Sequence, residues 1–162
     1  MTQAPQDEVP LLVHGRTWED MPTGSAFRTA KRTITETDLV TFLHVSGINE
    51  PLFYDADHAA GAGYSGRLVP GALVYVVAEG LILQTNVLHG TGLAFMSMEY
   101  SIKSPTFVGD TIHVVVEVEE SRVSSRGGRG VVRTRCGILN QRGEEVACFT
   151  PVRLIRGRDY AE

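Results

Sequence analysis

The length of 162 residues and the hydrophobic content of 43% are those of one domain that buries a core without a disulfide or a structural metal. A net charge of -4 without a long block of like charges argues against nucleic acid as a partner, and the two cysteines lack the spacing of a metal or redox site. Because the N-terminus does not resemble a signal peptide and the longest apolar run, residues 72–78, is too short to span a bilayer, we expect a cytoplasmic protein.

The first part of the chain predicts a polar lead-in followed by a helix. Residues 1–15 are polar and contain proline, so we expect them to be flexible. A short extended segment at 27–33 then leads into a helix, for which Thr35 and Asp38 form the pattern of a capping box. Apolar residues recur at helical spacing until Gly47, which is expected to end this helix.

The middle of the chain predicts a long helix that is buried. A loop and a short helix are expected over residues 48–66, where alanine and glycine are frequent. The long helix is expected to start at Pro70 and Gly71 and to end near Asn86. Since its apolar residues lie on nearly all sides, we expect the rest of the domain to wrap around it.

The last part of the chain predicts an antiparallel sheet. Apolar and polar residues alternate in segments near 93–102, 111–120, 130–139 and 145–155, and turn residues separate these segments. A meander of strands that must cover one buried helix gives an α+β domain, with a curved sheet around a long central helix. We expect this single domain to span residues 16–158.

Five short segments, taken in order, resemble the MaoC-like dehydratases and (R)-specific enoyl-CoA hydratases: TITETDLVTF, SGINEPLFYD, GRLVPGAL, PTFVGDTI and LNQRGEEV. The resemblance implies a hot-dog fold, a homodimer or higher oligomer, and an acyl-CoA or acyl-carrier thioester bound near the dimer interface. It further implies a lyase of fatty acid metabolism that adds water reversibly to a trans-2-enoyl thioester without a cofactor. In this family an Asp and a His of one loop activate the water.

The chain departs from the family at the residues that carry this chemistry. In the family's loop pattern G-D-x-N-P-L-H-x-D, the Asp position holds Ile48, the Asn position Glu50 and the His position Phe53. The residues that match the pattern are Gly47, Pro51, Leu52 and Asp55. Because isoleucine and phenylalanine can neither accept a proton nor hold a water, the family's usual mechanism is not expected to operate with these residues.

Other residues of the same region are candidates for the site. Asn49 and Glu50 could substitute as catalytic groups if the loop shifts, and a carboxyl in a semi-apolar pocket could act as an acid or base; alternatively, Glu50 is simply solvated. The resemblance places Gly71 where the family has its oxyanion glycine, with Pro70 in place of the usual His; alternatively, Gly71 only permits close packing. The residues expected to contact the substrate are Pro70, Gly71, Phe53 and Tyr54.

Three functions remain open at this point. The first is a hydratase or dehydratase with a rearranged site that uses Asn49 or Glu50. The second is a hot-dog thioesterase that uses Glu79, a carboxylate inside the otherwise apolar long helix. The third is a non-catalytic acyl-thioester binding module, or a partner subunit in a heterodimer with a catalytic hot-dog chain.

Overall fold

The computed structural model describes residues 11–161, so most of the predicted lead-in lies outside the described residues. From residue 15 onward the chain is held by the domain, because Gly15 N and Arg16 N donate to the carbonyls of His89 and Val87 at 2.8 Å. A short 3-10 helix, η2 (Trp18–Asp20), follows. The domain bounds of 16–158 stay a prediction.

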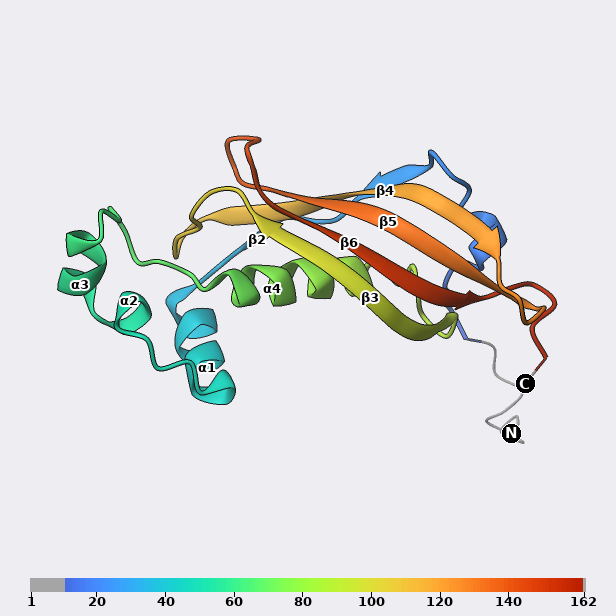
Figure 1. The fold of residues 1–162 in the computed structure, drawn as a ribbon, viewed down its shortest axis with the longest axis horizontal. Coiled ribbons are helices and arrows are strands. Elements are labelled where there is room, and N and C mark those ends of the chain that lie inside the picture. The colour runs from blue at the N-terminus through green and yellow to red at the C-terminus, as the bar shows by residue number, and fades with distance from the viewer. Residues whose placement is uncertain (1–10, 162) are drawn as a thin grey trace, which may run out of the picture.

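An antiparallel sheet makes up most of the molecule (Figure 1). Its order is β1-β4-β5-β6-β3, and β2 pairs with β4 beside β1. The four long strands fall where period-two alternation predicted them. The bounds of all strands are β1 (Ala26–Arg28), β2 (Arg32–Thr33), β3 (Gly92–Ile102), β4 (Thr111–Val123), β5 (Arg129–Leu139) and β6 (Glu145–Arg156).

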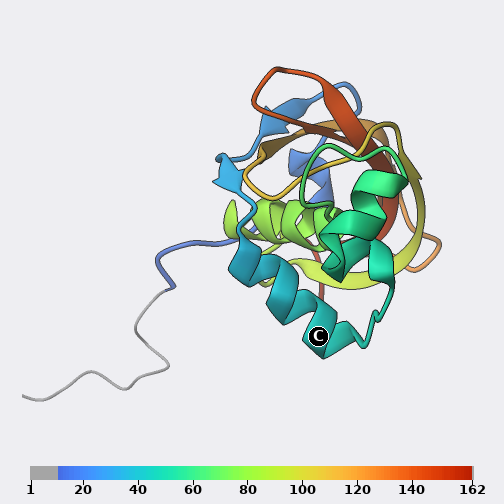
Figure 2. The ribbon, with the colours of Figure 1, turned by 90° about the vertical axis from the view of Figure 1, so that its left-hand side faces the viewer.

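The long helix α4 (Gly71–Gln84) lies in the concave face of this sheet, which curls around it (Figure 2). Side chains of alternate strand residues point at the helix and form the core with it. Members of this core are fully buried, among them Ile112, Val114, Ile138 and Phe149. The predicted α+β hot-dog architecture is confirmed.

Three helices precede α4 and stand together at its N-terminal end (Figure 1): α1 (Glu36–Ser46), α2 (Pro51–Tyr54) and α3 (Ala56–Gly61). The capping box of α1 is confirmed, because Thr35 Oγ1 accepts a hydrogen bond from Asp38 N at 3.2 Å and the Asp38 carboxylate accepts one from Thr35 N at 2.9 Å. Gly47 ends α1 in the left-handed conformation, with φ of 69°. These local signals therefore determine where α1 begins and where the loop after Gly47 starts.

One prediction about α4 is wrong, because the domain does not wrap it on all sides. Val76 and Leu83 are 51% and 50% exposed, and Ala72 is exposed on the same side of the helix. The sheet covers one side of the helix, while α1 to α3 stand at its end, so an apolar stripe is left open. The helix also ends at Gln84, earlier than predicted, and Asn86 adopts a positive φ of 60° in the turn beyond.

Candidate functional site

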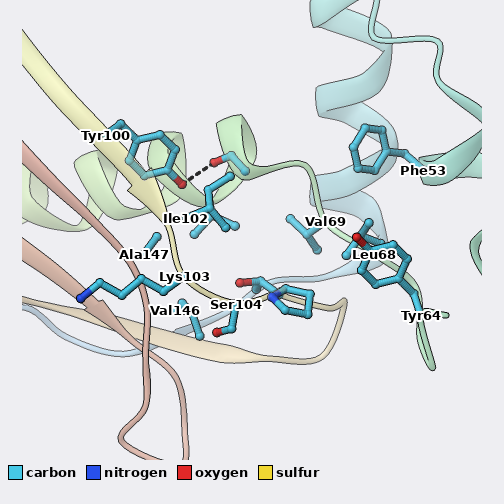
Figure 3. Close-up of a pocket in the computed structure, with 14 residues that line it drawn as sticks. Phe53, Tyr64, Leu68, Val69, Tyr100, Ile102, Lys103, Ser104, Val146 and Ala147 are labelled. Carbon is cyan, nitrogen blue, oxygen red and sulfur yellow. Dashed lines mark hydrogen bonds between the residues drawn. The ribbon is translucent and has the colours of Figure 1, made fainter. Parts of the chain in front are cut away.

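A cavity of about 340 Å³ opens at the N-terminal end of α4, between that helix, the end of β3 and the loops that follow (Figure 3). Its walls are largely apolar. The lining residues are Phe53, Tyr64, Leu68, Val69, Gly71, Val74, Tyr100, Ile102, Lys103, Ser104, Pro105, Thr106, Val146 and Ala147. Among these residues there is no carboxylate and no imidazole, the two side-chain types that the resemblance predicts for activating water.

Tyr100 fixes the first turn of α4 from the neighbouring strand. Its hydroxyl donates a hydrogen bond of 2.8 Å to the carbonyl oxygen of Gly71 (Figure 3). Burial raises the pKa of Tyr100 to about 12, so the phenol stays protonated at neutral pH and remains a donor. Its ring also packs against Tyr75, with the two ring centroids 5.8 Å apart. The start of α4 is therefore held in a defined position beside the cavity.

Gly71 lies in direct contact with the side chain of Ile102. A Cβ placed on Gly71 would lie 2.1 Å from Ile102 Cδ1, so only glycine allows this approach without a shift of Ile102. Close packing at this glycine is thus a feature of the structure. As the first residue of the helix, Gly71 also has an N–H without an intrahelical acceptor, at the positive end of the helix dipole.

The loop from Gly47 to α2 brings only one of its candidate residues to the cavity. Phe53, which the resemblance aligns with the family's His, lines the cavity, whereas the half-buried Ile48 does not. Arg67 holds this loop in place, because its guanidinium donates to the Phe53 carbonyl and to the Glu36 carboxylate of α1. An aromatic ring therefore lines the cavity, and the alignment of this residue with the family's His stays a prediction.

The other predicted site residues lie outside the lining. Asn49 and Glu50 are exposed, and Glu50 makes no capping hydrogen bond to α2. Tyr54 is exposed, and Pro70 is buried as the residue that precedes α4. Of the four residues expected to contact substrate, the structure brings Gly71 and Phe53 together at the cavity.

The Glu79 carboxylate forms an ion pair with Arg153. Both of its carboxylate oxygens accept hydrogen bonds of 2.7 Å from Arg153 of β6, whose guanidinium also stacks on Phe95. Glu79 lies eight residues beyond Gly71, which is about 12 Å along an α-helix. It does not line the cavity at Gly71 but a separate hollow of about 360 Å³ with Leu83 and Phe95. A thioesterase site with Glu79 next to Gly71 is therefore not formed in this chain.

A network of charges borders the cavity at the end of β3. Lys103 and Arg135 both donate to the Glu145 carboxylate, and the Arg135 contact measures 2.7 Å. Burial opposes the ionisation of Glu145, but the hydrogen bonds from Arg135 and Lys103 outweigh it and lower its pKa. Lys103 is therefore held by an ionised partner, and in Figure 3 its side chain extends away from Phe53.

Four residues at or near the cavity were not predicted from the sequence: Tyr100, Ile102, Lys103 and Arg67. Tyr100 and Ile102 lie two residues apart in a predicted strand, so period-two alternation places both on one face. The pattern does not say that this face meets Gly71, because that contact joins residues about thirty positions apart in the chain.

Two features are absent from the described part of the chain. Within residues 11–161, no helix has the length and apolar content needed to cross a membrane. Over the same residues, no group of three His, Cys, Asp or Glu side chains lies close enough together to hold a metal ion. The cytoplasmic location expected from the sequence stays a prediction.

Comparison with known proteins identifies relatives among dehydratases. The chain is 28% identical over 113 residues to the mitochondrial 3-hydroxyacyl-[acyl-carrier-protein] dehydratase FERN of Solanum lycopersicum, a match that covers 70% of this chain and 66% of that relative's length. Among solved structures, the monoamine oxidase regulatory protein from Archaeoglobus fulgidus superposes with a TM-score of 0.83 at 28% identity, covering 91% of this chain and 99% of that one. The MaoC-like dehydratase from Rhodospirillum rubrum superposes with a TM-score of 0.76 at 25% identity, covering 90% of this chain and all of that one.

The family assignment rests on a match over most of the domain. Residues 22–149 match the family described as "FAS1-like, dehydratase domain region". This range includes the loop with Ile48 and Phe53, the whole of α4 and the strands that enclose the cavity. The chain belongs to the FAS1-like dehydratase-region family, and its fold is the hot-dog fold of the MaoC-like dehydratases.

Proposed function

We propose that this chain binds an acyl thioester in the cavity at the start of α4 and acts as an acyl-thioester binding module rather than as a hydratase. The observation that carries the proposal is the cavity lining, which includes Gly71 and Tyr100 but no carboxylate and no imidazole. The relatives named as dehydratases support the substrate class.

The arrangement of the cavity fits the two ends of such a ligand. Its apolar walls, formed by side chains such as Val69, Val74 and Val146, would bury an acyl chain and remove it from water. The free N–H at Gly71 would donate to the thioester carbonyl, and the helix dipole would favour the negative charge on that oxygen. Tyr100 would keep the first turn of α4 in place while this happens.

Hydration requires groups that the cavity itself does not supply. Water must be deprotonated and a proton delivered to the α-carbon of the enoyl group. Ile48 and Phe53 cannot do this. Asn49 and Glu50, the substitutes predicted from the sequence, are exposed in this chain, so a reaction through Glu50 would need the loop to carry its carboxylate into the cavity. The geometry therefore favours binding over hydration by this chain alone.

We propose further that a second copy of this chain covers the open side of α4. The exposed Val76 and Leu83 of the helix lie on the side that the sheet leaves open, and the edge strand β3 exposes Phe95 and Met96. An apolar stripe next to an unpaired strand edge is typical of a surface that another chain covers.

Light scattering is expected to give the mass of a dimer for the wild-type chain, and the variant Phe95→Glu is expected to give a monomer. A wild-type monomer at micromolar concentration contradicts this proposal, whereas dimers that form only with a catalytic hot-dog chain would favour the heterodimer.

The test of the binding function follows the enoyl group and the thiol separately. Native protein is incubated with trans-2-enoyl-CoAs of increasing chain length, and loss of the conjugated enoyl absorbance and release of free thiol are recorded. We expect neither from the native chain, and slow enoyl loss from the double variant Ile48→Asp, Phe53→His, which restores the family's pair. Enoyl loss by the native chain would contradict a purely binding role and make Glu50→Gln the next variant, while thiol release would point to a thioesterase.

A further inference from the structure

We propose that Ile102 determines which acyl groups the cavity accepts, admitting straight-chain acyl thioesters and excluding those with a branch at the carbon next to the carbonyl. This inference rests on the proposed function, since it assumes that the thioester carbonyl lies at Gly71. It names a chemical class of substrate and a residue that selects it.

The position of Ile102 is the first ground for this role. Its Cδ1 and Cγ1 lie 2.1 Å and 3.1 Å from the point where a Cβ of Gly71 would be. The side chain is therefore packed against the first turn of α4, beside the N–H that a thioester carbonyl would approach. Figure 3 shows Ile102 beside the hydrogen bond of Tyr100.

The surroundings of Ile102 are the second ground, because the other walls near Gly71 have little freedom to move. Val69 and Val74 are buried in the core, and Tyr100 is anchored by its hydrogen bond to the helix. Ile102, at the end of an edge strand, is 60% exposed, so its side chain is the part of the wall that can differ in size without disturbing the core. Its size and rotamer therefore set the room that is left at the start of α4.

The geometry of an acyl thioester explains why this limited space would select against a branch at the α-carbon. When the carbonyl oxygen accepts a hydrogen bond from the first turn, the α-carbon is one bond from the carbonyl carbon and would lie against the Ile102 side chain, which leaves no gap against Gly71. A hydrogen on that carbon takes little room, whereas a methyl branch would have to displace the Ile102 side chain. Because isoleucine is branched at Cβ, it has few rotamers to adopt in response.

The experiment compares two ligands that differ by one α-methyl group, butyryl-CoA and 2-methylbutyryl-CoA, by titration calorimetry with the full-length chain. We expect wild type to bind butyryl-CoA at least about tenfold more tightly, the lower end of what one carbon is worth in an apolar pocket. Ile102→Ala is expected to bring the two dissociation constants within about threefold of each other, and Ile102→Val to give an intermediate ratio. Because Ile102 is exposed, these variants are expected to fold as wild type does.

Val123→Ala serves as the matched control, since Val123 is 58% exposed at the far end of β4 and is expected to keep the wild-type ratio. If butyryl-CoA binds and the ratio is the same in Ile102→Ala as in wild type, the role of Ile102 is overturned while the proposed function stands. If neither ligand binds to any of the chains, the proposed function is overturned and this inference with it. A loss of preference in Ile102→Ala but not in Val123→Ala supports both.

Discussion

Replacing Gly71 by leucine is expected to weaken acyl-thioester binding about 100-fold. A side chain at this position would collide with Ile102, which already lies 2.1 Å from the site of the missing Cβ, and would fill the space next to the first N–H of α4. The ligand would lose the hydrogen bond from this N–H, about 0.5–1.5 kcal/mol, and apolar contact worth about 1–3 kcal/mol, which together correspond to about 100-fold in Kd. Titration calorimetry with butyryl-CoA measures the loss.

Two further variants separate a lost binding site from a damaged fold. Gly127→Leu adds the same side chain in an exposed turn with nothing within 4 Å of the new Cβ, and is expected to leave binding unchanged. Gly71→Ala is expected to give a smaller loss than Gly71→Leu, because the flexible end of Ile102 can move aside. Unchanged binding in Gly71→Leu, with a native circular dichroism spectrum, would contradict the assignment of the thioester to this glycine.

Replacing Glu79 by alanine is expected to lower the free energy of unfolding by about 3 kcal/mol. The change leaves the Arg153 guanidinium without its carboxylate in a site where the Arg153 side chain is 8% exposed and that of Glu79 18% exposed. Removing one partner of a buried ion pair costs about 3–5 kcal/mol, and the partial exposure of Glu79 favours the low end. Urea denaturation followed by circular dichroism measures this loss as a lower transition midpoint.

A double variant that removes both charges separates the destabilisation caused by an unpaired Arg153 from the contribution of the ion pair itself to the free energy of unfolding. Glu79→Leu with Arg153→Met removes both charges and is expected to recover most of the stability lost in Glu79→Ala, because well-packed apolar side chains often replace a buried ion pair without loss. Glu79→Ala is also expected to bind butyryl-CoA as wild type does wherever it is folded. Equal stability of Glu79→Ala and wild type would show that the ion pair is not important for the fold.

Those parts of the fold that depend on neighbours in the chain could be predicted from the sequence. Thr35 and Asp38 satisfy the N-terminus of α1 between themselves, and Gly47 ends it through its own backbone conformation. Alternation in the four long strands placed them within a few residues of their observed bounds. Since each of these signals acts over a few residues, no knowledge of the tertiary structure was needed.

Features that depend on distant contacts could not be predicted. The open stripe with Val76 and Leu83 exists because the sheet curls around only one side of α4, and periodicity alone does not show which side that is. The contacts of Gly71 with Tyr100 and Ile102 join α4 to β3, and the link from Arg67 to the Phe53 carbonyl closes a loop over fourteen residues. The sequence therefore pointed to Gly71 and Phe53 but not to the side chains that shape the space between them.

Binding of an acyl thioester in the cavity at the start of α4 is tested by calorimetric titration of the native chain with trans-2-butenoyl-CoA, with free coenzyme A as the reference ligand. We expect saturable binding of the enoyl thioester at one site per chain, distinctly tighter than that of coenzyme A, with the enoyl absorbance unchanged at the end of the titration. Equal binding of the two ligands, or no binding of either, would contradict a thioester site in this cavity.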